Sequence, residues 1–264
     1  MSRADGVGFV PLPVAGALAY GQSDKRRQEA AVKMDTYGAV LSKKAIHILR
    51  QHAHDDMSIS SVRSFLYDML DPTPDRGDMI YRYEHSVRVA ENAAVIAEAE
   101  GLPKEDLIIA CLLHDVGYRE CREDFRRHPF YSADISRLYL EEIGYPPEPL
   151  QEMIRAIALH NLTDNLPGDM TAFQISVRDC DDIDRFDMIR TAMLLGDCVY
   201  EKTNQEIIAS CNQAIDGAKR IMSLQRGTRT AQNMINENCQ KRIVLLQDIL
   251  AQAKKGTILR MGMD

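Results

Sequence analysis

Apolar residues recur at three- and four-residue steps along most of the chain, and the two-residue alternation that is typical of β-strands is almost absent. This periodicity predicts an all-α fold. One or two helices are expected between Lys33 and about Leu70, and a Pro-, Gly- and Asp-rich break follows at 71–78. Further helices are expected at 79–100, 104–117, 128–144, 149–161 and 171–186.

The character of the chain changes after about residue 189. Two or three long amphipathic helices are expected, over 189–200, 203–225 and 230–255, with the last segment carrying an apolar stripe from Ile235 to Leu250. We interpret them as a helical hairpin that packs on the core or forms a subunit contact. At the other end, Pro11 and Pro13 interrupt the apolar residues, so 1–32 is predicted to be an extended or mobile tail.

Composition limits the partners. The 264-residue chain has a formal net charge of −7, which argues against nucleic acid or an anionic membrane surface as the main partner. Six cysteines form no CxxC pair and several lie in apolar runs, as expected for a reducing, cytoplasmic compartment. No stretch is apolar for 18 residues, so no membrane span is predicted.

Metal-ligand side chains lie beside apolar residues in four helical segments. They are His85, the pair His114-Asp115, His160 and Asp179. An imidazole or a carboxylate is costly to bury unless a partner satisfies it, and one divalent cation would satisfy several at once. Of these, His85, His114, Asp115 and Asp179 form a mixed nitrogen and oxygen set, which suits Mn, Fe, Co, Ni or Zn better than Ca.

Two histidines extend this set. His128 precedes a proline at a helix start, and His160 ends another helical stripe. If Asp115 bridges, they could hold a second ion, and two ions a few Å apart clamp the attacking and leaving oxygens of a phosphoryl transfer. A cap or surface role is the alternative for both. His47, His52 and His54 also cluster, but a polar helix end explains them better than a metal-binding tract.

The segments "EHSVRVAENA", "LIIACLLHDVGY" and "VRDCDDID" together resemble the HD superfamily of metal-dependent phosphohydrolases. The resemblance covers roughly residues 79–185 and implies an HD-domain-like helical bundle with N- and C-terminal helical extensions. It implies a metal-binding core at 75–188, N-terminal helices at 33–74 and C-terminal helices at 189–264. It also implies His85, His114, Asp115 and Asp179 as ligands of one divalent ion; Asp181, Asp182 and Asp184 compete with Asp179, and Asp182 is a candidate for supporting contacts.

The function expected from this resemblance is hydrolysis of a small phosphate ester or nucleotide by a metal-activated water. Asp115 would orient that water or take its proton. Arg82 lies one turn before His85, and its guanidinium fork matches a phosphate; a solvated helix arginine is the plain alternative. Arg119 and Lys104 are weaker phosphate-binding candidates.

Two other functions stay open. A mixed-valence di-iron oxygenase on the same scaffold would need both metals, and therefore His128 and His160. A non-catalytic nucleotide-sensing module would use its metal only to hold the fold, with the C-terminal helices as the partner surface. A homodimer through those helices is a further expectation, and the substrate is set by loops that carry no readable motif.

Overall fold

The computed structural model describes residues 37–74, 77–121, 124–162, 166–199 and 202–260. These residues form helices and no strand, which confirms the all-α prediction. The predicted tail at 1–32 lies outside them, and the domain boundaries stay predictions. In chain order the helices are α2 (Lys43–Gln51), α3 (Ile59–Leu70), α4 (Gly77–Glu100), α5 (Lys104–Leu113), the 3-10 helix η1 (Phe125–Arg127), α6 (His128–Glu142), α7 (Pro147–Leu159), α8 (Ala172–Arg185), α9 (Met188–Val199), α10 (Asn204–Met222) and α11 (Arg229–Arg260).

Helix α5 forms the centre of the core. Its residues from Leu107 to Leu113 are buried except Ile108, which is partly buried, and α3, α4, α7 and α8 surround it. A helix that is apolar on nearly every side reaches its lowest free energy only when other helices enclose it. The end of α5 therefore delivers the next residues, His114 and Asp115, into the interior.

Helix α8 starts at a well-formed cap. The Thr171 hydroxyl accepts a hydrogen bond from the Gln174 backbone N–H, and the Gln174 side chain accepts one from Thr171 N–H. This capping box satisfies two otherwise unpaired donors of the first turn. Every residue from Phe173 to Asp184 is buried, the four aspartates included. Partners must therefore surround the polar side of α8 as well as its apolar side.

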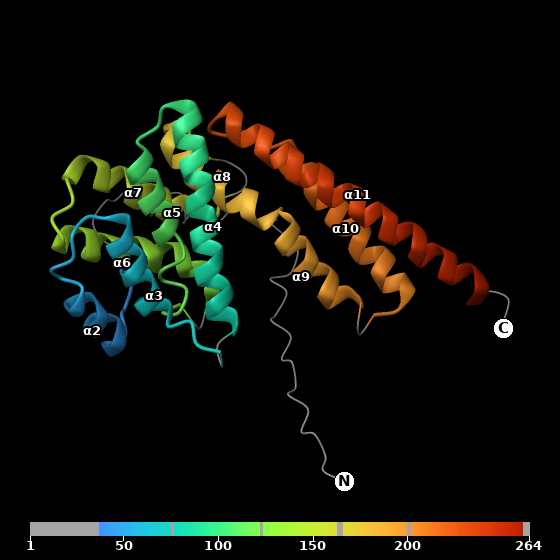
Figure 1. Cartoon of the computed structure of the whole chain (residues 1–264), viewed down its shortest axis with the longest axis horizontal. Helices are drawn as coiled ribbons and strands as arrows, with labels where there is room; N and C mark the ends of the chain where they lie inside the picture. Colours follow the sequence, from blue (N-terminus) through green and yellow to red (C-terminus); the bar gives the residue numbers. More distant parts are fainter. Residues whose placement is uncertain (1–36, 75–76, 122–123, 163–165, 200–201, 261–264) are drawn as a thin grey trace, which may run out of the picture.

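Helices α10 and α11 form the predicted hairpin, which extends away from the rest of the helices (Figure 1). Near the core α11 contacts α8 and α4. Further out, Cys211 and Ile215 of α10 pack against Leu246 and Leu250 of α11 in a second apolar cluster. A subunit contact through this hairpin stays a prediction. No helix in the described part of the chain combines the length and apolarity that crossing a membrane requires.

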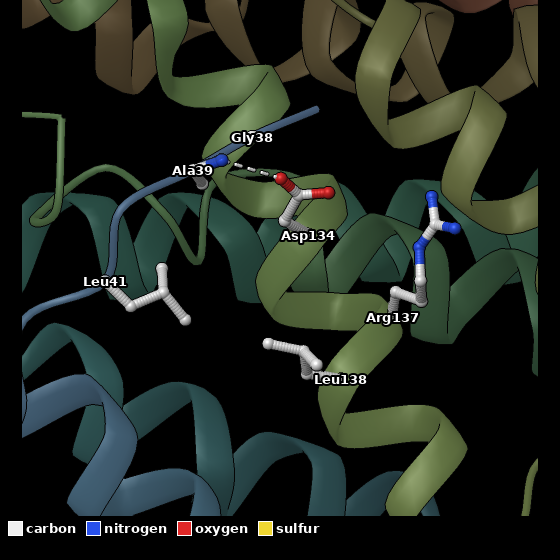
Figure 2. Close-up of a pocket in the computed structure, with 6 residues that line it drawn as sticks. All are labelled: Gly38, Ala39, Leu41, Asp134, Arg137 and Leu138. Carbon is white, nitrogen blue, oxygen red and sulfur yellow. Dashed lines mark hydrogen bonds between the residues drawn. The ribbon is translucent and has the colours of Figure 1, made fainter. Parts of the chain in front are cut away.

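The first described residues lie across α6. The carboxylate of Asp134 accepts hydrogen bonds from the backbone N–H groups of Tyr37 (2.8 Å) and Ala39 (3.0 Å). Beside this contact lies a small cavity of about 160 Å³ between the 38–41 segment and α6 (Figure 2). The Ser42 hydroxyl then caps α2 through the Ala45 N–H. Asp134 thus fixes the position at which the N-terminal helices join the core.

Candidate metal centre

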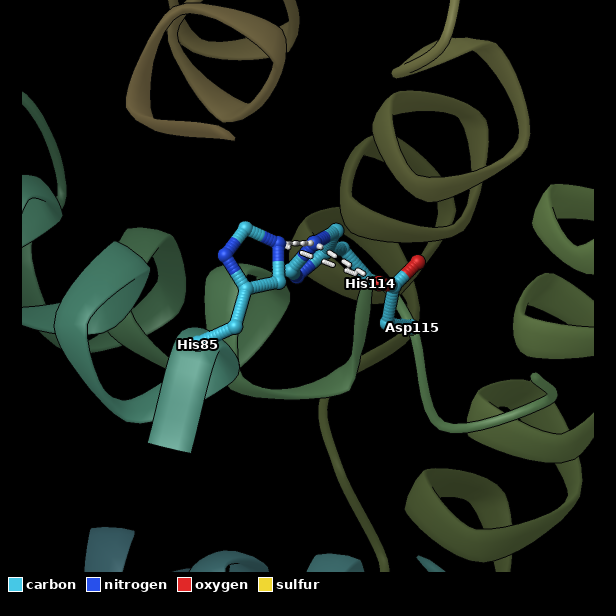
Figure 3. Close-up of side chains that lie close together, drawn as sticks. All are labelled: His85, His114 and Asp115. Atoms are coloured by element: carbon cyan, nitrogen blue, oxygen red, sulfur yellow. Dashed lines mark hydrogen bonds and ion pairs between the residues drawn. The ribbon is translucent and has the colours of Figure 1, made fainter. Parts of the chain in front are cut away.

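Four imidazoles meet around one carboxylate in the interior. His85 comes from the middle of α4, and His114 and Asp115 follow the end of α5; the two rings lie side by side with the carboxylate close to them (Figure 3). His128 starts α6 and His160 follows the end of α7. Three groups of possible ligands have their ligand atoms within 4.8 Å of one another: His85 with His114 and Asp115, His114 with His160 and Asp181, and Asp115 with His128 and His160. The structure thus brings together five of the six predicted ligands.

Backbone carbonyls fix the proton on three of the rings. Nδ1 of His114 lies 2.7 Å from the Cys111 oxygen, and His128 and His160 repeat this contact with the carbonyls three residues before them, at 2.6 and 2.7 Å. A carbonyl oxygen only accepts, so Nδ1 carries the hydrogen in each ring. A neutral ring then presents a bare Nε2 lone pair, the form in which histidine binds a metal.

The Nε2 atoms of the four rings lie close to one another. Nε2 of His128 and Nε2 of His160 are 3.1 Å apart, and Nε2 of His114 is 3.3 Å from Nε2 of His85. Asp115 lies between the two pairs. Its Oδ1 is 3.1 Å from His128 Nε2, and its Oδ2 is 3.7 Å from His114 Nε2. Oδ1 is buried and no donor satisfies it, since the His128 proton is on Nδ1.

His85 lies between two aspartates of α8. Its Nδ1 donates to Asp184 Oδ2 at 2.6 Å, and its Nε2 is 3.1 Å from Asp181 Oδ1. Burial by itself would lower the pKa of His85, but the two carboxylates outweigh it and raise that pKa to about 9. Arg88 also donates to both oxygens of Asp184. Asp184 is therefore a supporting residue that orients the imidazole and is itself held in place.

Burial and neighbouring charged side chains set the protonation states of Asp115 and His160. Burial would raise the pKa of Asp115, but the histidines at 114 and 128 and the guanidinium of Arg82 hold it well below its usual range. Burial, together with the neighbouring imidazoles, lowers the pKa of His160 to about 3. Asp115 is thus ionised beside the uncharged imidazole of His160, and carboxylates and neutral imidazoles are donors of a transition-metal site.

Asp179 is a correction to the predicted ligand set, because it points away from the imidazoles. Its Oδ1 accepts from Arg178 (2.8 Å) and Arg226 (3.1 Å), and its Oδ2 accepts from the backbone N–H of Gly227 (2.7 Å). Residues two apart on a helix point about 200° apart, so Asp181 takes the place next to His85.

The supporting role predicted for Asp182 is a second correction. Asp182 shares the face of Asp179 and accepts from Arg226 at 2.7 Å, so it belongs to the contact with the α10–α11 loop. Asp181 and Asp184 are the two site residues that the sequence did not single out. Their only signal was membership of the four-aspartate run, in which the sequence pattern favoured the wrong member.

Of the three predicted phosphate-binding residues, Arg82 contacts a side chain of the centre, whereas Lys104 and Arg119 pair with acidic residues outside it. The Arg82 guanidinium reaches the centre and donates to Asp115 Oδ2 at 2.9 Å. Lys104 begins α5 and pairs with Glu98 at 2.7 Å, about 15 Å along the helix from His114, so its prediction is wrong. Arg119 donates to Asp71 (3.1 Å). His52 lies apart from the centre between Asp55 and Asp68, as the non-metal interpretation expects.

The turn that follows Asp115 packs tightly on α6. A Cβ on Gly117 would overlap the backbone nitrogen of Ser132 and come within 2.6 Å of the Tyr131 carbonyl carbon. The Gly117 N–H also donates to the Ser132 hydroxyl at 3.0 Å. Only glycine allows this approach, which keeps the start of α6, and with it His128, close to Asp115.

The residues present fit a divalent metal. The Nε2 lone pairs of His128 and His160 face each other, and the ionised Asp115 Oδ1 beside them is buried without a donor. Such groups are costly to bury unless a partner satisfies them. No thiolate is among the grouped ligand atoms in the described residues, so the set matches the nitrogen and oxygen ligands of a transition metal rather than a structural zinc site.

Residues 82–189 match the family model described as HD domain. This region runs from α4 to the start of α9 and holds every side chain of the centre. Residues 82–189 therefore form an HD domain, and the superfamily of this domain is of the metal-dependent phosphohydrolase type. HD domains bind divalent metals, in agreement with the cluster.

One solved structure is similar to the chain: a predicted HD superfamily hydrolase from an uncultured Thermotogales bacterium. It shares 19% sequence identity, with 80% of this chain and 91% of that chain covered and a TM-score of 0.47. No curated protein matches the chain.

Proposed function

We propose that this protein hydrolyses a small phosphate ester or a nucleotide with the help of two divalent metal ions. The observation that carries the proposal is the position of Asp115. One of its oxygens faces the Nε2 atoms of His128 and His160, and the other faces those of His85 and His114. A carboxylate in this position can bridge two ions, and paired ions are typical of phosphoryl transfer.

Two ligand sets follow from the distances. His85, His114 and Asp181, with Asp115 Oδ2, would hold one ion, and His128 and His160, with Asp115 Oδ1, would hold the other. When bound, such ions supply a Lewis acid for a phosphoryl oxygen and lower the pKa of water toward neutrality.

Asp115 and Arg82 supply what the protein itself contributes. The low pKa of the Asp115 carboxylate makes it a hydrogen-bond acceptor that keeps no proton, so we assign it to orient the attacking water rather than to store the proton. Arg82 uses one N–H on Asp115. Its guanidinium has five N–H groups, so others are available to a phosphoryl oxygen, where a planar fork binds in bidentate fashion.

The test is a comparison of metal content and phosphate release. Protein purified without chelator is analysed for bound elements, reconstituted with Mn, Fe, Co or Ni, and assayed on phosphomonoesters and nucleotides. We expect a metal-to-chain ratio near two and phosphate release from part of the panel, both reduced by His114→Ala. A reconstituted protein that is inert on the whole panel, with His114→Ala retaining full metal, would contradict the proposal.

A second candidate is a mixed-valence di-iron oxygenase. The observation in its favour is the same meeting of His128 and His160 at Asp115 Oδ1, since that chemistry also needs a second metal position. Iron near two per chain, visible absorption and oxygen consumption without phosphate release would favour the oxygenase. Phosphate release with Mn or Co, which does not depend on oxygen, would favour the hydrolase.

A further inference from the structure

The candidate metal centre is more open on one side than elsewhere. The side chains of His85, His114, Asp115 and His160 are at most 2% exposed. The side chains of Arg82 (21%), His128 (13%) and Asp181 (9%) are more accessible. A substrate must therefore approach across Arg82, His128 and Asp181.

Two tyrosines flank this side. The Tyr81 ring stacks on His85 at a centroid distance of 5.7 Å and an interplanar angle of 9°, and the Tyr118 ring lies 5.1 Å from His128. The Arg82 guanidinium is 3.7 Å from the Tyr118 centroid and 5.6 Å from that of Tyr81. Neither phenol oxygen hydrogen-bonds within the described part of the chain. Both hydroxyls are thus available to a ligand.

Arg190 also lies beside Tyr81 but, unlike Arg82 and Arg88, its guanidinium donates to no carboxylate among the described residues. Its guanidinium carbon is 5.0 Å from the Tyr81 centroid, and the side chain is only partly exposed. Arg82 and Arg88 donate to Asp115 and Asp184. The Arg190 guanidinium has no carboxylate or carbonyl partner among the described residues; only its backbone N–H bonds, to Asp187.

Both basic and acidic side chains lie near Arg190, among them Arg185, Arg242 and Asp187. Burial lowers the pKa of Arg242 to about 10, and the charges of Arg190 and Arg185 act in the same direction. A partly buried guanidinium that lacks a hydrogen-bond acceptor among the described residues would be stabilised by an anion. Because Tyr81 contacts both the Arg190 guanidinium and the His85 ring, that anion would lie close to the metal ligands.

We propose that Arg190, supported by the ring of Tyr81, binds a second negatively charged group of the substrate, separate from the phosphoryl group at the metal centre. This proposal rests on the function proposed above and narrows it: the substrate is a small phosphate ester that also carries a carboxylate or another phosphate. A guanidinium matches either group in a fork. Arg190 is one residue beyond the matched HD domain, so it would set specificity from outside that region.

Binding to the Mn-loaded protein tests this directly. The probes are ω-carboxyalkyl phosphonates with one to four methylene groups and alkyl phosphonates of equal length, titrated by calorimetry. The chain length is varied so that one probe can span the distance between the metal centre and Arg190. Phosphonates are used because they are not hydrolysed. We expect one carboxylate length to bind at least ~10-fold more tightly than its uncharged counterpart, which corresponds to about 1.4 kcal/mol.

Three variants make the result specific. For Arg190→Gln, we expect the affinities for the carboxyalkyl phosphonate and for the alkyl phosphonate of equal length to agree within two-fold. Arg190→Lys should keep part of the preference for the carboxylate. Arg229→Gln is the matched control, because Arg229 is exposed and lies far from the metal centre. The next residue, Thr230, donates its backbone N–H to Glu100 at the end of α4. Glu100 follows His85 by 15 residues, which is about 22 Å along that helix. Circular dichroism and metal content confirm that each variant is folded and loaded.

Each alternative outcome identifies what failed. If Arg190→Gln keeps the full carboxylate preference, or if the wild type has none, the second anion site is wrong while the phosphohydrolase proposal stands. If no phosphonate of either series binds the metal-loaded wild type, the proposed function fails, and the role of Arg190 fails with it.

Discussion

Asp184 accepts a hydrogen bond from Nδ1 of His85 at 2.6 Å, and this contact turns the other ring nitrogen of His85 toward the metal centre. Two N–H groups of Arg88, one turn further along α4, donate to the same carboxylate at 2.6 and 3.2 Å. The orientation of one proposed ligand thus depends on a chain of contacts that runs from α8 to α4.

Asp184→Asn should weaken metal binding by about 10- to 100-fold, the usual effect of losing a supporting carboxylate. The amide cannot replace both the charge and the Arg88 pair, so His85 loses its fixed orientation. Competition against a chelator of known affinity measures the change. Glu91→Gln is the control, since Glu91 is exposed on the same helix. Equal metal affinity in wild type and Asp184→Asn would refute this role.

Asp181→Asn and Asp179→Asn should have opposite consequences, although their positions are two residues apart. Asp181→Asn should lose metal while staying folded, because Asp181 Oδ1 lies 3.1 Å from His85 Nε2. Asp179→Asn should keep its metal but lose stability by about 3 kcal/mol, since it leaves the buried Arg226 and Arg178 less compensated. Elemental analysis and urea unfolding separate the two effects. The reverse pattern would restore Asp179 as the ligand.

Gly117→Ala should destabilise the protein by roughly 1–3 kcal/mol, because its Cβ would overlap the backbone of α6 at Tyr131 and Ser132. The displacement should also move His128 and reduce metal binding at its position. The control is Gly217→Ala in α10, where a Cβ meets nothing within 4 Å and removal of a helix glycine should stabilise by up to ~1 kcal/mol. Thermal unfolding compares them, and an unchanged Tm for Gly117→Ala would contradict the packing argument.

His52 should make stability depend on pH. Its Nδ1 lies 2.7 Å from Asp55 and its Nε2 lies 2.9 Å from Asp68; carboxylates accept, so both nitrogens donate and the ring is cationic. Burial would lower the pKa of His52, but the two aspartates outweigh it and raise the pKa. The stabilisation is therefore complete below about pH 6.5, the unfolded value, and is lost as pH rises through the raised folded pKa.

The free energy of unfolding of His52→Gln, relative to wild type, tests this sign. The deficit of the variant should be larger at pH 6 than at pH 9. His47→Gln serves as the control because His47 is exposed on α2, the helix that His52 directly follows. A deficit that stays constant, or one that grows with pH, would show that the aspartates do not hold a cationic ring.

The amino-acid sequence by itself determined the helices and most of the centre. The three- and four-residue apolar steps predicted a helix at 79–100, and α4 spans Gly77–Glu100. The all-apolar run from Leu107 to Leu113 predicted an enclosed helix, which delivers His114 and Asp115 to the interior. Periodicity sufficed here because apolar side chains gain free energy from burial wherever the partner lies.

Only the tertiary structure decided which aspartate of α8 belongs to the centre. Helical periodicity assigns polar residues to solvent, but α8 is buried on all sides, so its pattern carries no information about rotation. Arg226 and Gly227 settle the rotation by binding Asp179, which turns Asp181 toward His85. Those partners lie more than forty residues later in the chain. A contact of that separation leaves no local signal, because it depends on how the hairpin packs against the core.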